Sequence, residues 1–334
     1  MVLATLGAAP LRAEPINIDA AAISQFHVRD PARRFGDLVF LGGLNLTARD
    51  RDFGGFSGVL ASPDGTELLL VSDLGRWLTL SLDQGADGTP RGIAHAELTP
   101  RLTEAGETPP TKAEEDAEAL ARKGDQVLVS VESGRKLLAY PGPDPVGDIP
   151  TRLPLPAETR CLPGNGGLEA MAVAPPSSPV AGSLMLFAER ACRKGAGLTG
   201  EGMLPFWRVT PNGSVVRGAL VRDRDYRPTD AAFLPGGDLL LLERRYDGGI
   251  DIGMQVRRIG RDALAARAPL TGPVLMEADF AYEIDNMEGI AVSADGFGRP
   301  LMTLISDDNR SLLQRTLLLR FRLETPVPRP KPQM

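Results

Sequence analysis

Acidic residues recur in this chain at a nearly regular spacing, each close to one end of a short apolar segment. One set of polar residues, separated by about 50–60 positions, comprises Ser57, Glu118, Glu169, Asp230 and Glu288. A second set ends the apolar segment that follows each of these, and comprises Asp73, Glu132, Glu189, Glu243 and Asp307. Carboxylates in such numbers can coordinate a hard cation such as Ca²⁺ or move protons during hydrolysis.

Arginine follows every acid of the second set within one to three residues. These residues are Arg76, Arg135, Arg190, Arg244, Arg245 and Arg310. A guanidinium group binds carboxylate or phosphate through two parallel hydrogen bonds, which leaves two interpretations open. The pairs could be ion pairs that stabilise each repeat, or the arginines could hold an anionic substrate beside carboxylates that hold a metal.

Other kinds of catalytic site find little support in the sequence. The chain has only two histidines, His27 and His95, which argues against zinc sites built from histidine and weakens a Ser-His-Asp triad. The segment around Ser57 does not complete the G-x-S-x-G nucleophile motif. The net charge of −6, with no basic stripe, predicts no nucleic-acid partner.

The spacing of the acids reflects a structural repeat. Each copy reads as a strand that carries the first polar residue, a tight turn, and an apolar strand that ends in the second acid, as in 55–59 followed by 68–73. A repeat of 50–60 residues is typical of one four-stranded propeller blade, and the 37 glycines and 29 prolines fit a turn-rich, all-β chain. Because the first strand of each blade lines the channel, both sets of acids should converge on one axis.

Five copies do not by themselves fix the number of blades. Segments 35–41 and 315–321 also look like strands, and together they could form one more blade. We therefore predict an all-β fold, a single β-propeller with six blades, and keep five blades as the alternative. In either case the N- and C-terminal strands should share a sheet and close the ring, which removes exposed sheet edges.

The two ends of the chain suggest an exported protein. Residues 1–13 resemble a signal peptide truncated at its start, because a basic leading region is missing; a disordered N-terminus is the alternative. We expect a lead-in at 14–34, the propeller at 35–323 and a proline-rich tail at 324–334. Cys161 and Cys192 suit a disulfide in an oxidising compartment, the periplasm or the exterior. No apolar stretch is long enough to span a membrane.

The sequence resembles the bacterial "esterase-like activity of phytase" family, the phytase-like domain proteins, over about residues 35–323. The matching motifs are FGGFSG at 53–58, SDLGRW at 72–77, DAEAL at 116–120, NGGLEA at 165–170, PTD at 228–230, LERR at 242–245, DNMEGI at 285–290, SDDN at 306–309 and QRT at 314–316. The resemblance implies a propeller, export, and hydrolysis of esters or phosphate esters. The better-known β-propeller phytases have a calcium-filled acidic channel, which agrees with the converging carboxylates.

These arguments predict a calcium-dependent hydrolase of phosphate or carboxylic esters that acts as a monomer on a small anionic ester. The expected metal ligands are Asp73, Glu118, Glu169, Asp230, Glu243, Glu288 and Asp307, and the candidate catalytic residues among them are Glu169, Asp230 and Glu288. The expected substrate-binding residues are Arg76, Arg190, Arg244, Arg245 and Arg310. Two alternatives remain: a non-catalytic binding or scaffolding propeller of the cell envelope, and a calcium-dependent sugar-lactone hydrolase.

Overall fold

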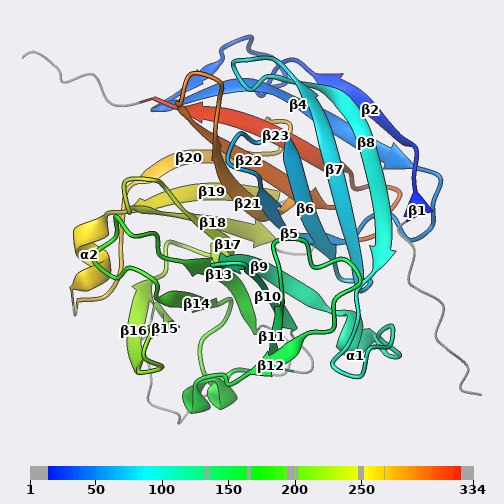
Figure 1. The fold of residues 1–334 in the computed structure, drawn as a ribbon. Helices are drawn as coiled ribbons and strands as arrows, with labels where there is room; N and C mark the ends of the chain where they lie inside the picture. The colour runs from blue at the N-terminus through cyan, green and yellow to red at the C-terminus, as the bar shows by residue number, and fades with distance from the viewer. Residues whose placement is uncertain are drawn as a thin grey trace, which may run out of the picture.

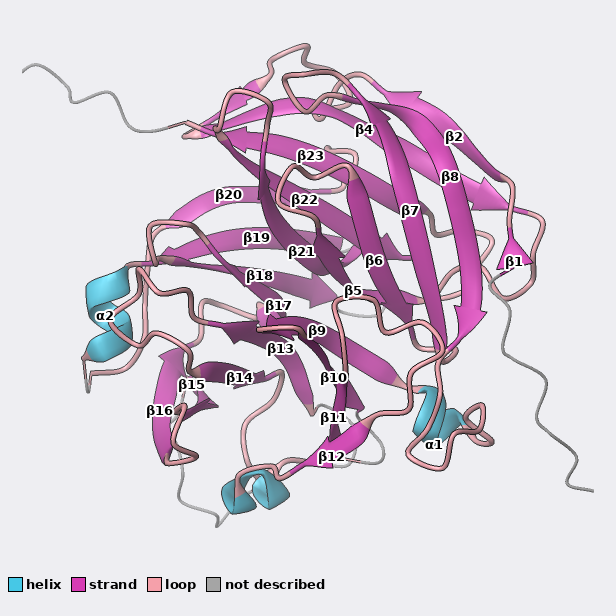
Figure 2. Ribbon diagram, viewed as in Figure 1, coloured by secondary structure: helices cyan, strands magenta, loops and turns pink. Residues whose placement is uncertain are grey.

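The computed structural model describes residues 14–131, 135–163, 167–193, 200, 202–246, 252–266 and 268–324. Within this part of the chain, five antiparallel sheets stand around a central channel as the blades of a propeller (Figures 1 and 2). The expected signal peptide at 1–13 and residues 325–334 of the expected tail lie outside the described residues. No described helix is both long enough and apolar enough to cross a membrane.

In each of the first four blades, the four main strands lie in chain order from the channel outward. The first contains β5 (Phe56–Ala61), β6 (Glu67–Ser72), β7 (Arg76–Gln84) and β8 (Pro90–Pro100), with β1 (Glu14–Pro15) at its outer edge. The second contains β9 (Ala117–Lys123), β10 (Gln126–Val131), β11 (Lys136–Tyr140) and β12 (Thr151–Leu153). The third contains β13 (Leu168–Val173), β14 (Leu184–Ala188), β15 (Met203–Val209) and β16 (Val215–Val221). The fourth contains β17 (Arg227–Phe233), β18 (Leu239–Tyr246), β19 (Ile252–Ile259) and β20 (Val274–Asp279).

The fifth blade joins the two ends of the chain. From the channel outward it contains β21 (Asn286–Ala294), β22 (Pro300–Asp307), β23 (Thr316–Leu323), β4 (Leu38–Ala48) and β2 (Ile18–Ile23), while β3 (Arg34–Phe35) pairs with β4. The described part of the chain has three short helical segments between strands: α1 (Lys112–Glu115), α2 (Arg261–Ala265) and the 3-10 helix η1 (Ala157–Cys161). In Figure 1 the blue β4 lies beside the red β23.

The prediction of six blades is wrong, and the five-bladed alternative is correct. The fifth sequence copy supplies only β21 and β22, so its sheet is completed by β23 and by the N-terminal strands, which therefore do not form a blade of their own. Closure of the ring by the two chain ends is confirmed, since β23 pairs with β4 over a register that includes Leu318 opposite Leu44.

The second strand of each blade is mostly apolar because the blade is covered on both faces. In β18, Leu240 and Leu242 belong to the core shared with the fifth blade, whereas Leu239 and Leu241 belong to the core shared with the third. All four side chains are fully buried. A strand buried on both sides loses the alternation of a half-exposed strand, as the sequence repeat indicated.

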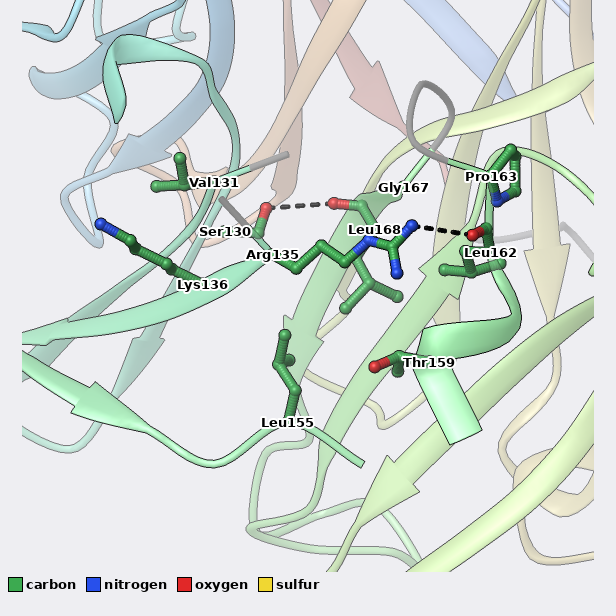
Figure 3. Close-up of a pocket in the computed structure, with 10 residues that line it drawn as sticks. All are labelled: Ser130, Val131, Arg135, Lys136, Leu155, Thr159, Leu162, Pro163, Gly167 and Leu168. Atoms are coloured by element: carbon green, nitrogen blue, oxygen red, sulfur yellow. Dashed lines mark hydrogen bonds between the residues drawn. The ribbon is translucent and has the colours of Figure 1, made fainter. Parts of the chain in front are cut away.

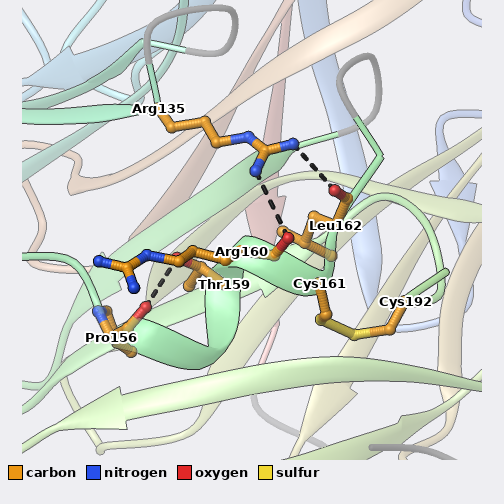
Figure 4. The surroundings of a disulfide bond; sticks show 7 residues. All are labelled: Arg135, Pro156, Thr159, Arg160, Cys161, Leu162 and Cys192. Carbon is orange, nitrogen blue, oxygen red and sulfur yellow. Dashed lines mark hydrogen bonds between the residues drawn. A yellow bond between two sulfur atoms is a disulfide. The ribbon is translucent and has the colours of Figure 1, made fainter. Parts of the chain in front are cut away.

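The predicted disulfide between Cys161 and Cys192 is present (Figure 4). It joins η1, which precedes the third blade, to the segment that follows β14. The bond therefore ties two connections of the propeller that the sheet hydrogen bonds do not link.

Reduction of this disulfide should lower the free energy of unfolding by about 3 kcal/mol, because the reduced chain gains conformational freedom when it unfolds. The measurement is urea denaturation with and without dithiothreitol. Since the chain has only these two cysteines, the double variant C161S/C192S should match the reduced protein and show no response to dithiothreitol. Equal stability of the oxidised and reduced proteins would show that the bond does not stabilise the fold.

Candidate active site

A β-bulge interrupts the inner strand of every blade at the same level of the channel. In each case the pairing with the second strand skips one residue of the inner strand. The skipped residues are Ser57, Glu118, Glu169, Thr229 and Glu288. A bulge redirects a side chain away from the regular pleat. Four of the five residues, all except the buried Thr229, line one pocket at this end of the channel.

In the fourth blade the bulge lies one residue earlier in the chain than the sequence repeat predicted. The bulge falls on Thr229, and Pro228 pairs with Glu243 just as Leu168 pairs with Ala188 in the third blade. Arg244 therefore occupies the position that Glu189 holds in the third blade. The expected ring members Asp230 and Glu243 each lie one residue away from the equivalent positions.

Asp230 is a structural residue of the blade interface. Its side chain is almost fully buried, and its carboxylate accepts hydrogen bonds from the N–H groups of Ala231 and Ile290, both at 2.8 Å. The second bond links β17 to β21 of the neighbouring blade. Burial raises the pKa of Asp230 well above its ordinary value. This residue does not line the acidic pocket that the other acids form.

Glu243 is also held inside the protein. Both of its carboxylate oxygens accept hydrogen bonds from Arg257, each at 2.5 Å, and Gln255 donates a further bond at 2.9 Å. The side chain of Glu243 is fully buried, and burial raises its pKa in spite of the partner Arg257. A buried, fully paired carboxylate of this kind positions strands rather than ligands.

The remaining acids gather in a pocket of about 190 Å³ at the end of the channel where the second strands terminate. The residues that line it are Ser57, Asp73, Asp116, Glu118, Glu169, Glu189, Arg190, Arg244, Asn286, Glu288, Asp307 and Asn309. Seven carboxylates therefore surround two guanidinium groups. Glu132, which the sequence placed in the same ring, lies outside the described residues.

Arg244 lies among these carboxylates. Its Nε is 3.2 Å from Oε1 of Glu288, its Nη1 donates to Oδ1 of Asn286 at 2.8 Å, and its Nη2 is 3.9 Å from Oε1 of Glu189. Burial would lower the pKa of Arg244, but the surrounding carboxylates, Glu288 first, outweigh it and raise the pKa. Arg244 therefore stays charged, and its side chain remains one quarter exposed to the pocket.

Two of the pocket acids carry protons more readily than usual. Burial raises the pKa of Glu288, although Arg244 and Asn286 oppose this effect. Burial and the neighbouring Glu288 raise the pKa of Asp307 to about 8. The pocket thus offers a carboxyl group that can donate a proton at neutral pH, beside a fixed positive charge.

The other arginines that the sequence singled out have different surroundings. Arg190 lines the pocket and pairs with Glu189 at 3.1 Å. Arg76 pairs with Asp52, and Arg310 donates to a backbone carbonyl at 3.1 Å. Arg245 lies over the ring of Tyr226, 5.5 Å from its centre. Arg76, Arg245 and Arg310 do not line the pocket.

Three pocket residues belong to neither of the two repeating sets of polar residues that the sequence singled out: Asp116, Asn286 and Asn309. Asn286 donates from Nδ2 to Oε1 of Glu288 at 2.8 Å, and the backbone N–H of Asn309 donates to Oδ1 of Asp307 at 2.7 Å. Asp116 pairs with Lys112 at 3.2 Å. Each lies within two residues of a predicted acid, so their proximity in sequence was the signal available.

The carboxylates as they lie do not assemble a metal site. Among the described residues, no group of three or more Asp, Glu, His or Cys side chains is arranged to hold a metal ion. The oxygen donors are of the type that Ca²⁺ prefers, but a guanidinium group stands among them. Calcium binding stays a prediction.

The opposite end of the channel has a different character. A cavity of about 240 Å³ there is lined by inner-strand residues of all five blades, among them Val59, Leu120, Phe233 and Val292. Arg122 is the one charged residue of this lining. The ionisable groups of the channel are thus concentrated at one mouth.

The fold and the site define a five-bladed β-propeller whose channel ends in an acidic pocket that contains an embedded arginine. The model of the family described as "Phytase-like: Esterase-like activity of phytase" matches residues 51–310. The chain belongs to this family, as the sequence resemblance predicted. A search of curated proteins found no match.

Several solved propeller structures show weak similarity to the chain. A glutaminyl cyclase from Myxococcus xanthus shares 13% identity at a TM-score of 0.42, over 86% of this chain and 97% of its own. A gluconolactonase from Xanthomonas campestris shares 15% at 0.38, over 94% and 99%. The PQQ-bound aldose sugar dehydrogenase from Streptomyces coelicolor shares 12% at 0.44, over 91% and 99%. These similarities are too weak to bear on activity.

The raised pKa of Asp307 predicts a dependence of stability on pH. Its pKa is about 8 in the folded protein against an ordinary value of 3.8, so between these values the folded state holds a proton that the unfolded chain releases. Stability should therefore fall as pH rises from 4 to 8. D307N removes this effect, which is on the order of several kcal/mol.

The measurement is urea denaturation from pH 4 to 8.5 in the presence of EDTA. D307N should lose less stability over this range than the wild type, whereas D83N, which changes an exposed aspartate on β7, should follow the wild type. Parallel curves for D307N and the wild type would contradict the raised pKa.

Proposed function

We propose that this protein hydrolyses phosphate or carboxylic esters in the acidic pocket, and that Arg244 binds the anionic oxygens of the substrate. The observation that carries the proposal is the exchange of an acid for Arg244 in the fourth blade, which places one guanidinium group inside a ring of carboxylates. A pocket of carboxylates alone would repel an anionic ester. With Arg244 it has a point of attachment beside groups that can transfer protons.

The chemistry follows from the protonation of the pocket. Asp307, whose pKa is raised to about 8 by burial and by the neighbouring Glu288, can donate its proton to the leaving alkoxide. Glu169, on the equivalent bulge of the third blade, can accept a proton from the attacking water. The water oxygen forms a bond to the carbonyl carbon or phosphorus, and the ester oxygen leaves with the proton from Asp307. Arg244, aided by Arg190, stabilises the negative charge on the non-bridging oxygens.

We further propose that the protein is exported to the periplasm or beyond the cell and acts there as a monomer. The disulfide supports this placement, because disulfides persist in oxidising compartments. In this proposal residues 1–13 direct export, and the substrate is a small anionic ester that enters by the acidic mouth of the channel.

Calcium enters the proposal as a prediction that can be tested separately. The lining residues supply hard oxygen ligands, and seven carboxylates exceed the two arginines in charge, which favours uptake of a cation. No step above depends on the metal.

One observation favours the non-catalytic binding propeller as the second candidate. Arg190 and Arg244 already contact pocket acids, as a set of structural ion pairs would. That alternative predicts stability effects without turnover. The sugar-lactone hydrolase is a special case of carboxylic-ester hydrolysis and is included in the assays below.

Replacement of Arg244 should impair turnover. R244M should lower kcat/KM by about 100-fold or more for phosphate and carboxylic esters, because one preorganised group that stabilises developing charge contributes about this much. R244K retains the charge without the planar guanidinium and should lose less. The assay uses 4-nitrophenyl phosphate, 4-nitrophenyl acetate and gluconolactone.

The matched control is R217M, which changes an exposed arginine on β16, far from the pocket lining. Thermal unfolding shows whether each variant is folded. Folded wild type without activity on any of the three substrates would overturn the proposed hydrolysis, and full activity in R244M would exclude Arg244 from substrate binding.

Removal of calcium tests the remaining prediction. Treatment with EDTA should lower turnover, and added Ca²⁺ should restore it, whereas E169Q should weaken both Ca²⁺ binding and the response. Calorimetric titration of Ca²⁺ measures binding directly. Turnover that is insensitive to EDTA, together with the lack of a Ca²⁺ binding signal, would leave the metal out of the mechanism.

A further inference from the structure

A third hollow, of about 790 Å³, lies along the segment that runs from β12 into η1. The disulfide at the end of η1 is close by (Figure 4). The half-buried side chains of Leu153 and Leu155 pack on the protein core and form the apolar floor of the hollow, together with adjacent prolines. Three arginines, Arg135, Arg152 and Arg160, also line it. We call this hollow the arginine groove.

Arg135 is fixed in place before any ligand arrives. Its Nη2 donates to the carbonyl of Leu162 at 2.9 Å, and its Nη1 reaches the carbonyl of Arg160 at 3.5 Å (Figure 4). Its backbone has a φ of 43°, a left-handed conformation that a side chain of this size rarely adopts. Figure 3 shows the same side chain beside a narrow slot near Ser130 and Leu168. A guanidinium held in this way loses little further freedom on binding.

The groove carries positive charge that the described residues do not neutralise. No carboxylate is among its described lining residues, and Glu158 on the same 3-10 helix does not line it. Arg135 donates to carbonyls, and within the described chain neither Arg152 nor Arg160 forms an ion pair through its side chain. In a protein with a net charge of −6, three guanidinium groups around one hollow are complementary to an anion.

The shape and chemistry narrow the class of ligand. The volume lies in the range of small-molecule sites, roughly 300–1,000 Å³. Phosphate offers several oxygens to converging guanidinium groups, and the leucine floor fits an apolar body attached to it. Insertion into a membrane would require protruding apolar side chains, whereas Leu153 and Leu155 are half-buried.

We propose that the arginine groove binds a small organic phosphate, with the phosphate on Arg135, Arg152 and Arg160 and the apolar body over Leu153 and Leu155. The groove shares no lining residue with the acidic pocket. The proposal therefore stands apart from the proposed hydrolysis and can succeed or fail independently of it.

The test is calorimetric titration of the full chain with benzylphosphonate, which carries a phosphate-like dianion and an aromatic ring and is not hydrolysed. We expect saturable binding that the double variant R152A/R160A weakens by about 10-fold or more. Both side chains are exposed, so the variant should remain folded, and the single variant R152A with a smaller loss serves as a check. R217A, which removes an exposed arginine of the neighbouring blade, should bind like the wild type. Inorganic phosphate should bind about 10-fold more weakly, because it cannot cover the leucine floor.

The variant R244M separates the groove from the acidic pocket. Benzylphosphonate binding that R244M retains and R152A/R160A loses supports the groove. Two sites, of which each variant loses one, support both proposals. If only R244M abolishes benzylphosphonate binding, or if R152A/R160A and the wild type bind benzylphosphonate with equal affinity, the proposed groove site is overturned.

Titration with two further probes tests the class of ligand. Preferential binding of polyglutamate, or of phosphatidylglycerol vesicles, through Arg152 and Arg160 would replace the small phosphate with an acidic peptide or a lipid surface and so overturn the proposal. The absence of detectable benzylphosphonate binding up to about 10 mM, a concentration above the Kd of even a weak ligand, overturns the proposal as well.

Discussion

The pairing of β23 with β4 is the interaction on which the rest of this molecule depends. It joins segments from the two ends of the chain in one sheet and so closes the ring of five blades. Without closure, the first and the last blade would each expose one face of apolar side chains, since every blade is buried by both neighbours. Closure also sets the positions of the five inner strands around one axis. The acidic pocket is therefore a product of long-range sheet pairing, although each of its residues comes from a short local repeat.

The distinction between local and long-range information explains which features could be predicted from the sequence. The period of the repeat and the apolar second strands are local, and they were enough to predict a propeller whose channel gathers acids. The number of blades could not be predicted in this way, because the sheet that residues 315–321 join depends on pairing with residues distant in the chain. The disulfide was predictable since the chain has only two cysteines and both suited the same compartment.

The fourth blade shows a finer limit of sequence analysis. Thr229 and Asp230 are adjacent polar residues, as are Glu243 and Arg244, and nothing local indicates which member of each pair occupies the bulge position and which faces the core. Hydrogen bonds from neighbouring elements determine which residue of each pair is held inside the protein. Asp230 receives the N–H of Ile290 from the next blade, and Glu243 receives Arg257 from the next strand. These partners lie on other strands, so acids of the same type line the pocket in the other four blades and act as internal supports in the fourth blade.

The position of Arg244 also has a consequence for symmetry. Five blades with identical lining would form a ring in which a ligand on the axis could sit equally well in any of five rotational settings. The guanidinium groups of Arg190 and Arg244 lie on the adjacent third and fourth blades and face carboxylates of the other blades, which creates a lateral electric field across the channel. A ligand with a charged end and a neutral end would then have one favoured orientation about the channel axis. A fold assembled from similar repeats thus has an asymmetric binding site where the repeats meet.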